Sequence, residues 1–302
     1  MIGAKKTRFV YNKHKRKTFP SNNRAISPAI ATVIMTAAII VLVLVAMSYA
    51  QTYLTSSIAQ NDFSTNKQFM LTTGLQIDNV AWMMGRTQTI TYSSTYGSLE
   101  FLWNKTAQPL SYSMEINKGS GWELVNISLQ TGIILFNMPT TEYTLGNNYF
   151  DQLSSNGSFL QEGPSAPVSD VYVIEKLPMS DGNFLRIAAV PSIRMLNTTV
   201  GTQSNYEFYL PLLQSGTNLG LSQSVTLTGQ SVTQYIQSGV TKVEFISSFP
   251  LTSEGFNSGF FPFKNTLVSS QYVTIALNNP PGTTSTVELY VGGVSVSLGL
   301  YG

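Results

Sequence analysis

The residues of this chain whose types could do chemistry are a few carboxylates. Asp170, Glu175 and Asp181 form one local acidic group, and Asp62 with Asp78 forms another. Two carboxylates held about 5–10 Å apart can hydrolyse a glycosidic bond. Nothing in the spacing of these residues fixes such a separation, so we interpret them as solvated charges of loops and strand edges. A secreted glycan hydrolase that uses a carboxylate pair is kept as an alternative.

Other catalytic chemistry has little support in the composition. The chain has no cysteine, which excludes disulfides, thiolate nucleophiles and cysteine metal sites, and its single histidine is His14. The sequence has no glycine-rich phosphate-binding loop of the kind that lies between a strand and the start of a helix. We therefore predict a protein that is not an enzyme, with no catalytic residue, no metal site and no cofactor.

The element that must organise the chain is a long apolar stretch near the N-terminus. No charged residue occurs from position 25 to position 61. As a helix, the roughly 20 residues from Ala29 to Ser48 would cross the roughly 30 Å hydrocarbon core of a bilayer. Because such a helix is apolar on every side, it must be surrounded by lipid or by other chains.

The segment before this helix is strongly basic. Residues 1–25 contain eight Lys and Arg and no Asp or Glu, which predicts a cytoplasmic N-terminus and an external location for the rest. Without residues 1–25 the chain has nine basic and fifteen acidic residues, a formal charge of −6. The basic character therefore indicates a membrane face, and we predict no nucleic-acid partner.

The junction between the basic segment and the helix carries a family resemblance. The sequence NRAISPAIATVI, residues 23–34, resembles the class III signal peptide of archaeal type IV pilins, of the archaellin-like superfamily. In that family a membrane peptidase removes the basic leader. The resemblance implies a cut between Ala25 and Ile26, with Arg24 just before it. Bacterial pilins place a glutamate where this chain has Ile30.

The resemblance also implies a function and partners. The precursor would sit in the cell membrane, and the processed chain would be a structural subunit of an extracellular filament on the cell surface, a helical homopolymer that serves adhesion. Its partners would be copies of itself, the prepilin peptidase, and an assembly ATPase with its membrane platform. The helix residues expected to mediate polymerisation are Pro28, Ile30, Ile34, Ile39, Val43 and Met47.

The chain after the helix is predicted to be rich in strands. We expect the helix to end near Ala59 or Gln60, so that the regions are a leader at 1–25, a helix at 26–60 and an extracellular part at 61–302. Short runs of β-branched and aromatic residues between turns predict an antiparallel, sandwich-like region, in an α+β fold with one or two subdomains. Residues 151–169 form either a long loop or a subdomain boundary.

The predicted strands are residues 87–92, 97–103, 110–116, 131–136, 171–175, 184–190, 206–210, 224–228, 240–246 and 272–277, followed by a C-terminal hairpin. In this hairpin Gly292 and Gly293 form a two-residue turn between two alternating strands.

The β-rich part contains candidate glycosylation sites and aromatic residues that could lie on an extracellular surface. The four sequons Asn104, Asn126, Asn156 and Asn197 are candidates for N-glycosylation on an extracellular surface. The aromatic residues are mostly expected in the core. The glycine-broken aromatic segment 253–263 is the best candidate for contact with surface or glycan ligands.

One alternative to a pilin remains open besides the hydrolase. Ser48, Tyr49 and Ala50 are acceptable to an ordinary signal peptidase. A cut before Gln51 would release a secreted β-sandwich binding protein, and no cut at all would leave a membrane-anchored one. Neither would form filaments.

Overall fold

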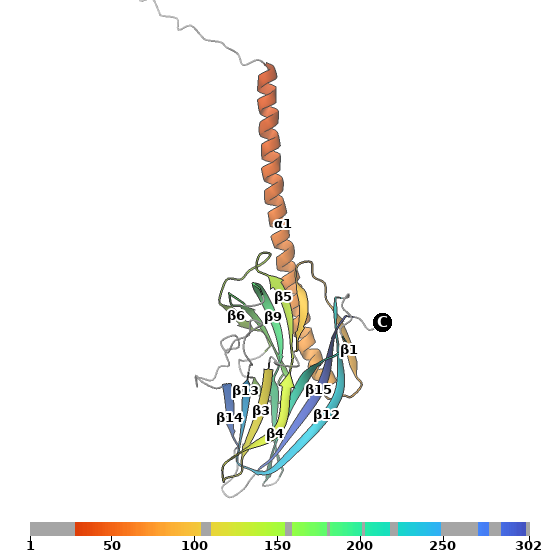
Figure 1. Ribbon diagram of the computed structural model, residues 1–302, viewed down its shortest axis with the longest axis vertical. Coiled ribbons are helices and arrows are strands. Elements are labelled where there is room, and N and C mark those ends of the chain that lie inside the picture. Colours follow the sequence, from red (N-terminus) through yellow and green to blue (C-terminus); the bar gives the residue numbers. More distant parts are fainter. Residues whose placement is uncertain are drawn as a thin grey trace, which may run out of the picture. The chain divides into compact units, whose positions relative to one another are not determined.

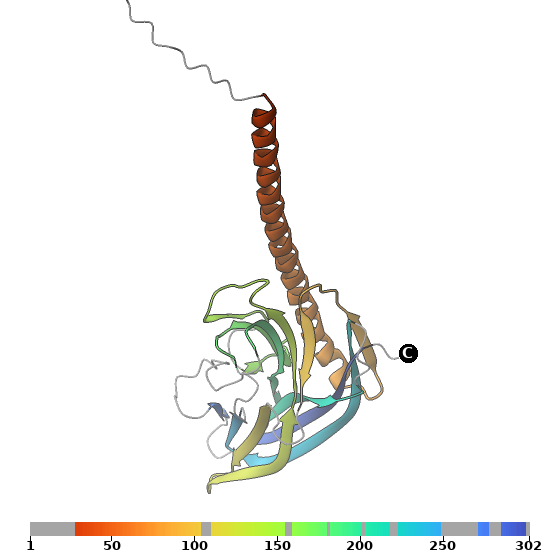
Figure 2. The ribbon, with the colours of Figure 1, turned by 45° about the horizontal axis from the view of Figure 1, so that its top comes forward.

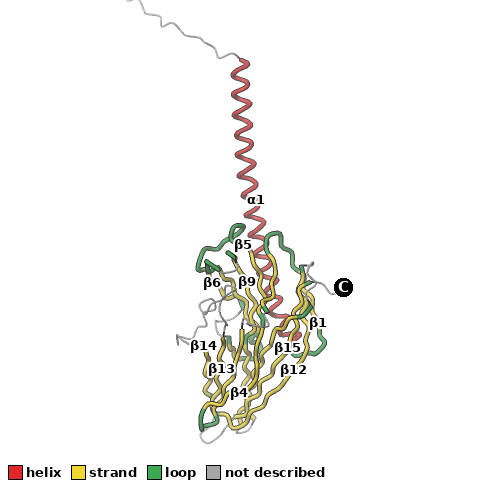
Figure 3. The backbone as a smooth tube through the Cα atoms, viewed as in Figure 1, coloured by secondary structure: helices red, strands yellow, loops and turns green. Residues whose placement is uncertain are grey.

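The computed structural model describes residues 28–103, 110–154, 159–179, 182–200, 203–217, 223–248, 271–277 and 285–299. It confirms the α+β fold class, with one long apolar helix followed by a large region of strands (Figures 1 and 3). The chain divides into two compact units, Met1–Thr52 and Tyr53–Gly302. The helix contributes residues to both units.

The helix α1 extends from Pro28 to Ala81, so the predicted end near Gln60 is wrong. Proline suits the first turn of a helix because its fixed φ is helical and its missing N–H would have no helical partner there. Beyond Tyr53 the helix buries one side, because the buried residues recur at spacings of three and four. These are Ala59, Phe63, Asn66, Met70, Thr73, Ile77 and Val80. Thr72, Thr73 and Gly74 have weak helix propensity. Packing of the buried side keeps the chain helical at these three positions.

The second unit contains three sheets. The six-stranded sheet has the order β1-β12-β15-β11-β10-β7, the four-stranded sheet β14-β13-β3-β4, and the five-stranded sheet β2-β5-β9-β8-β6. The strands are β1 (Thr87–Thr91), β2 (Ser98–Leu102), β3 (Leu110–Asn117), β4 (Trp122–Thr131), β5 (Ile133–Pro139), β6 (Tyr149–Gln152), β7 (Leu160–Glu162), β8 (Ser169–Glu175), β9 (Phe184–Pro191), β10 (Ile193–Val200), β11 (Gln203–Ser215), β12 (Ser224–Val240), β13 (Lys242–Ser248), β14 (Gln271–Ala276) and β15 (Ser285–Leu298).

Strand pairing is mostly antiparallel, but two pairs are parallel. β11 runs parallel to β15 over eleven residue pairs, from Asn205 opposite Thr286 to Ser215 opposite Val296, and β10 runs parallel to β7. The segment 151–169, where we expected a loop or a boundary, contains β7 and the ends of β6 and β8. It lies inside the second unit.

The predicted C-terminal hairpin is wrong, because β15 continues through Gly292 and Gly293. The two glycines serve close packing instead of a turn. A Cβ atom at Gly292 would lie 2.5 Å from the carbonyl oxygen of Ala81, at the end of α1. Gly229 on β12 is similar, with the carbonyl oxygens of Val80 and Met83 both 2.3 Å from the position of its missing Cβ. The end of the helix therefore rests directly on the sheet backbone.

Two hydrophobic cores hold the second unit together. One lies among strands of all three sheets and includes Tyr112, Phe208 and Phe245. The other places α1 residues such as Met70 and Ile77 against the opposite face of the five-stranded sheet and against one end of the six-stranded sheet. The five-stranded sheet is covered on both faces, which explains why β5, β8 and β9 are buried at almost every position.

Candidate functional site

The first candidate site is the apolar segment of α1 from Pro28 to Thr52. Every residue from Pro28 to Leu54 is exposed in the chain as it stands. The six predicted polymerisation residues belong to this segment, and the exposed fractions of five of them are Ile30 55%, Ile34 58%, Ile39 59%, Val43 49% and Met47 64%. Among the described residues, α1 is the one helix long and apolar enough to cross a membrane.

The three threonine side chains of this segment donate hydrogen bonds to the helix itself. The hydroxyl of Thr32 donates to the carbonyl oxygen of Ala29 at 2.9 Å, and that of Thr36 donates to the carbonyl oxygen of Thr32 at 2.8 Å. A hydroxyl with a partner in its own helix needs no water. The segment therefore presents an almost purely apolar surface, suited to lipid or to the apolar helices of other chains.

The acidic residues near the helix have structural partners. Asp62 accepts hydrogen bonds from the backbone N–H groups of Thr95 and Tyr96 at 2.5 and 3.3 Å, which holds the loop between β1 and β2. Asp78 accepts a hydrogen bond from Trp82 Nε1 at 2.7 Å and lies 2.9 Å from the guanidinium of Arg194. Neither carboxylate is free for a substrate in this geometry.

The expectation of a solvated charge is wrong for Asp170, which lies buried on β8 with 1% of its surface exposed. Its carboxylate accepts hydrogen bonds from Gln161 Nε2 at 3.2 Å, Ser154 Oγ at 3.4 Å and the Tyr172 hydroxyl at 3.4 Å. Burial, and secondarily the charge of Asp170, raises the pKa of Tyr112 well above its usual value, and the same two causes raise the pKa of Tyr172. Asp170 thus belongs to a buried polar cluster.

Glu175 is also buried, but on the other face of β8. It accepts hydrogen bonds from the backbone N–H groups of Leu145 and Gly146 and from the hydroxyl of Thr144. Side chains alternate along a strand, so residues five apart point to opposite faces and are separated by about 16 Å. The structure therefore does not bring Asp170 and Glu175 together as a hydrolytic pair. Asp181 lies outside the described residues.

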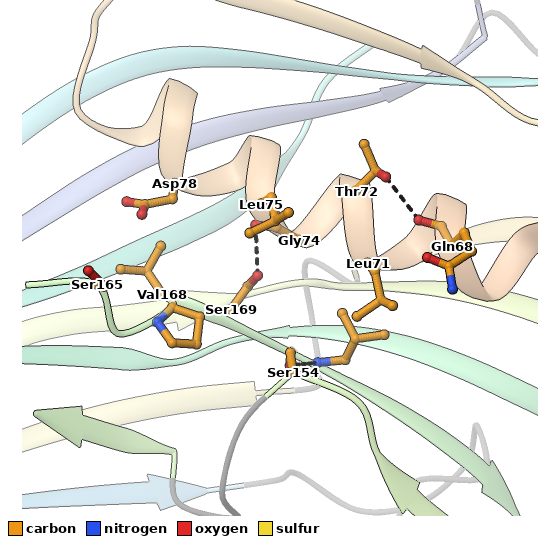
Figure 4. Close-up of a pocket in the computed structure, with 12 residues that line it drawn as sticks. Gln68, Leu71, Thr72, Gly74, Leu75, Asp78, Ser154, Ser165, Val168 and Ser169 are labelled. Carbon is orange, nitrogen blue, oxygen red and sulfur yellow. Dashed lines mark hydrogen bonds between the residues drawn. The ribbon is translucent and has the colours of Figure 1, made fainter. Parts of the chain in front are cut away.

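A cavity of about 450 Å³ lies beside α1 within the second unit (Figure 4). Leu71, Leu75 and Asp78 line it from the helix, and serines from the segment around β8 line the other side. Ser169 Oγ donates to the carbonyl oxygen of Gly74 at 2.9 Å, and both residues line this cavity. The lining is aliphatic and hydroxylic, and its one carboxylate is already paired, so the cavity offers packing and weak hydrogen bonds.

Sequence reasoning missed a row of side chains on the outer face of the six-stranded sheet. Tyr209 on β11 stacks on Tyr290 of β15, with ring centroids 4.9 Å apart and planes at 9°. Each tyrosine hydroxyl donates to a glutamate of its own strand at 2.6 Å, Glu207 and Glu288 respectively. The hydrogen bond to Glu288, together with burial, raises the pKa of Tyr290 to about 12.

The signal for this row was present in the sequence. The triplets Glu207-Phe208-Tyr209 and Glu288-Leu289-Tyr290 share one pattern, in which the apolar middle residue points into the core. Parallel pairing sets Tyr209 opposite Tyr290 and Glu207 opposite Glu288. Only the long-range pairing of β11 with β15, which local patterns do not reveal, makes the two triplets neighbours.

The predicted modification sites are only partly described. The processing site Arg24, Ala25 and Ile26 and the aromatic segment 253–263 lie outside the described residues, as do the sequons at Asn104 and Asn156. Asn126 lies in β4, with its side chain outside the description. Asn197 is exposed on β10, opposite Tyr206 of β11. Among the four sequons, Asn197 is the one whose side chain is described as accessible.

Other aromatic residues divide between packing and exposure. Trp82 packs edge-on against Tyr209 at 5.2 Å, and Trp103 stacks on Phe101. Trp122 and Leu124 of β4 are 43% and 59% exposed.

Comparison of the chain with protein family models, with curated proteins and with solved structures finds no match.

Proposed function

We propose that this chain is a structural, pilin-like subunit of an extracellular filament of the archaeal type IV pilus kind, which polymerises through the apolar segment of α1 and serves surface adhesion. The observation that carries the proposal is the fully exposed, uncharged helical segment from Pro28 to Thr52, attached to a compact β-rich unit. A surface of this kind requires an apolar partner along its whole length.

The energetics favour other copies of the same helix as that partner once the chain leaves the membrane. At about 25 cal/mol per Å², withdrawing roughly 400 Å² of apolar helix surface from water contributes about 10 kcal/mol, before the cost of ordering the subunits. This contribution suffices to hold subunits together without covalent links. Head-to-tail contacts that do not close into a ring produce an open helical polymer.

The proposal includes a processing route and a location. The basic leader keeps the N-terminus of the precursor in the cytoplasm, and a prepilin peptidase cuts between Ala25 and Ile26. An assembly ATPase and its membrane platform then move the freed helix into the growing filament at the cell surface. The helix supports membrane anchoring of the precursor.

In this proposal the protein is not an enzyme. Asp62, Asp78, Asp170 and Glu175 each hold a loop, a helix end or a buried cluster in place. Glycans on sequons such as the exposed Asn197 would cover part of a surface that carries few charges. Ligands at the cell surface would meet the β-rich unit.

The second candidate is a secreted or membrane-anchored binding protein that forms no filament. One observation favours it, because the compact unit begins at Tyr53, close behind the small residues that a signal peptidase would accept before Gln51. The exposed Trp122 and Leu124 would be a natural contact surface for such a protein.

Electron microscopy of cells with matched variants tests the proposal. Ile39→Asn places an amide in the middle of the apolar segment, where Ile39 is 59% exposed. We expect at least tenfold fewer filaments with Ile39→Asn, while fractionation still finds the chain in the membrane. The control Met84→Asn, at a 72% exposed position outside the helix, should leave filaments at the normal number. Normal filaments with Ile39→Asn would contradict the proposal.

A further inference from the structure

β12 has a neighbouring strand on both sides over only part of its length. β15 pairs with it from Val225 to Val240, but β1 pairs only with Ser224–Thr228. No described strand pairs with Ser231–Gln237 on the side away from β15. In Figures 1 and 2 this half of β12 runs along the outer margin of its sheet. Within the described part of the chain, no strand pairs with the outward backbone N–H and C=O groups of this segment, which makes it an edge that can accept a further strand.

This free edge lacks the features that usually protect an edge strand. Proteins prevent edge pairing with charges, prolines or bulges, yet Ser231–Gln237 contains no charged residue and no proline. The two irregularities of β12 lie outside the segment, between Gly229 and Ser231 and between Gln237 and Val240. They bracket seven residues of regular strand, and Gln234 is the midpoint of these seven.

The side chains of the edge are exposed and uncharged. Val232 and Ile236 are 40% and 54% exposed, and they lie on the outer face together with Gln234. Tyr235 lies on the other face, where it packs partly against the core. Gln234 donates from Nε2 to Glu288 at 2.8 Å and to the Tyr290 hydroxyl at 2.9 Å, which fixes the middle of the segment on its own sheet.

The seven residues are complementary to a second copy of themselves. If two copies run antiparallel with Gln234 opposite Gln234, then Val232 lies opposite Ile236 and Thr233 lies opposite Tyr235. Residues opposite each other share a face, so aliphatic side chains meet on the outer face and a β-branched residue meets an aromatic one on the inner face, both favourable pairs. A shift by two residues would place Ile236 opposite Gln230 and lose the aliphatic contact.

We propose that two copies of this chain pair through this edge, with their Ser231–Gln237 strands antiparallel and centred on Gln234. The interface is isologous, because the same seven residues contribute from each side. An interface of this length gives weak, reversible pairing, which becomes strong only where many copies are displayed side by side. The pairing uses no residue of the apolar helix segment, so it stands or falls separately from filament assembly.

Single cysteines test the register directly, because the chain has no cysteine of its own. Opposite residues of an antiparallel pair have Cα atoms about 4.5–5.5 Å apart, within the range of a disulfide. In the full chain dispersed in detergent, we expect Gln234→Cys to form disulfide-linked dimers under mild oxidation at least tenfold faster than Ser215→Cys. Ser215 is the control because it is exposed on β11, which β15 separates from the edge strand β12.

A mixture of two variants distinguishes the proposed register from chance collisions. Val232→Cys mixed with Ile236→Cys should give mixed dimers at least tenfold faster than either variant alone, because two copies of residue 232, or of residue 236, would be about 14 Å apart. Equal rates for Gln234→Cys and Ser215→Cys, or for the mixture and Val232→Cys alone, would overturn the proposal. Cross-linking of this edge to a different protein in cells, with no dimer of the chain, would also overturn it.

A charge at the centre gives a second test. In the proposed pair, Gln234→Lys places two lysines opposite each other, one from each copy, where their charges repel. Within each copy the new lysine lies next to Glu288 of its own sheet. We expect the dimer fraction in analytical ultracentrifugation to fall at least tenfold, with thermal unfolding unchanged, whereas Ser215→Lys changes neither.

The double variant Ile39→Asn, Gln234→Cys should lose filaments and keep its dimer cross-link. Loss of the cross-link with Ile39→Asn would overturn this proposal and leave the filament proposal standing.

Discussion

The carboxylate of Asp78 lies 2.9 Å from the guanidinium of Arg194, which joins the last turn of α1 to β10 of the six-stranded sheet. The guanidinium also lies over the ring of Tyr209, 5.1 Å from its centroid. Arg194 is only 13% exposed, and its Nε has no hydrogen-bond partner among the described residues. Asp78 is therefore the main compensation for a nearly buried positive charge.

The first prediction concerns this ion pair. Asp78→Asn should lower the free energy of unfolding by about 1–3 kcal/mol, because a nearly buried charge loses its partner. Urea unfolding of the detergent-dispersed chain, followed by tryptophan fluorescence, measures the change. The control Lys118→Gln breaks an exposed pair with Glu123 and should cost about 0.5 kcal/mol or less. Equal effects of the two variants would refute this role for Asp78.

The second prediction uses two adjacent glycines of β15. A Cβ at Gly292 would press on the backbone carbonyl of Ala81, which cannot easily move, whereas a Cβ at Gly293 would meet the Ser231 hydroxyl, which can rotate. Gly292→Ala should therefore cost about 1–3 kcal/mol through overpacking. Gly293→Ala should cost clearly less in the same urea titration. The opposite order would show that the end of α1 does not rest on the sheet in this way.

The third prediction concerns alkaline pH. The pKa of Tyr290 is raised from 10 to about 12 by its hydrogen bond to Glu288 and by burial, and burial together with Glu207 also raises the pKa of Tyr209. Below pH 10 both folded and unfolded chains keep these protons, so this contribution to stability is fully present. Above pH 10 the unfolded chain releases them first, so stability falls as pH rises toward 12.

Urea midpoints measured from pH 9 to pH 12 test this direction. The wild-type midpoint should fall above pH 10, and the fall should be shallower for Tyr290→Phe, which has no phenolic proton to lose. Glu288→Gln should lower the pKa of Tyr290 toward 10, measured by NMR of labelled tyrosine. An unchanged Tyr290 pKa in Glu288→Gln would show that the hydrogen bond is not the cause.

The fourth prediction separates structure from catalysis at Glu175. Glu175→Ala removes the acceptor of two backbone N–H groups and one hydroxyl in the loop at residues 144–146. We expect a loss of about 1–3 kcal/mol in stability and roughly tenfold faster hydrogen exchange at Leu145 and Gly146. Glu162→Gln, at an exposed position on β7, is the control. Unchanged exchange in Glu175→Ala would remove the evidence for a structural role.

Local patterns in the sequence predicted much of the fold. The uncharged apolar run gave the first part of α1, and alternating β-branched and aromatic residues located many strands to within a few residues. They missed β4, β6, β7 and β10 and the second half of β12. These elements are specified by short-range periodicity, which a sequence displays directly. The same periodicity fails where tertiary contacts decide the outcome. Thr72, Thr73 and Gly74 are poor helix formers that become helical because their helix packs against two sheets.

The remaining errors have the same origin. Gly292 and Gly293 have the composition of a turn, but they are needed where a helix end touches the sheet backbone, a contact 211 positions away in sequence for Gly292 and Ala81. The row of Tyr209 and Tyr290 depends on a parallel pairing of β11 with β15. Asp170 and Glu175, expected as solvated charges of loops and strand edges, are instead buried on β8, which lies between β9 and β6, and alternation along this strand sends them to opposite faces.

The N-terminus of the mature chain tests the central claim most directly. Mass spectrometry and N-terminal sequencing of material sheared from the cell surface would identify the first residue and the assembly state together. The filament account predicts a polymer whose chains begin at Ile26 and retain the whole apolar segment of α1. Monomeric surface material whose chains begin at Gln51 would contradict it.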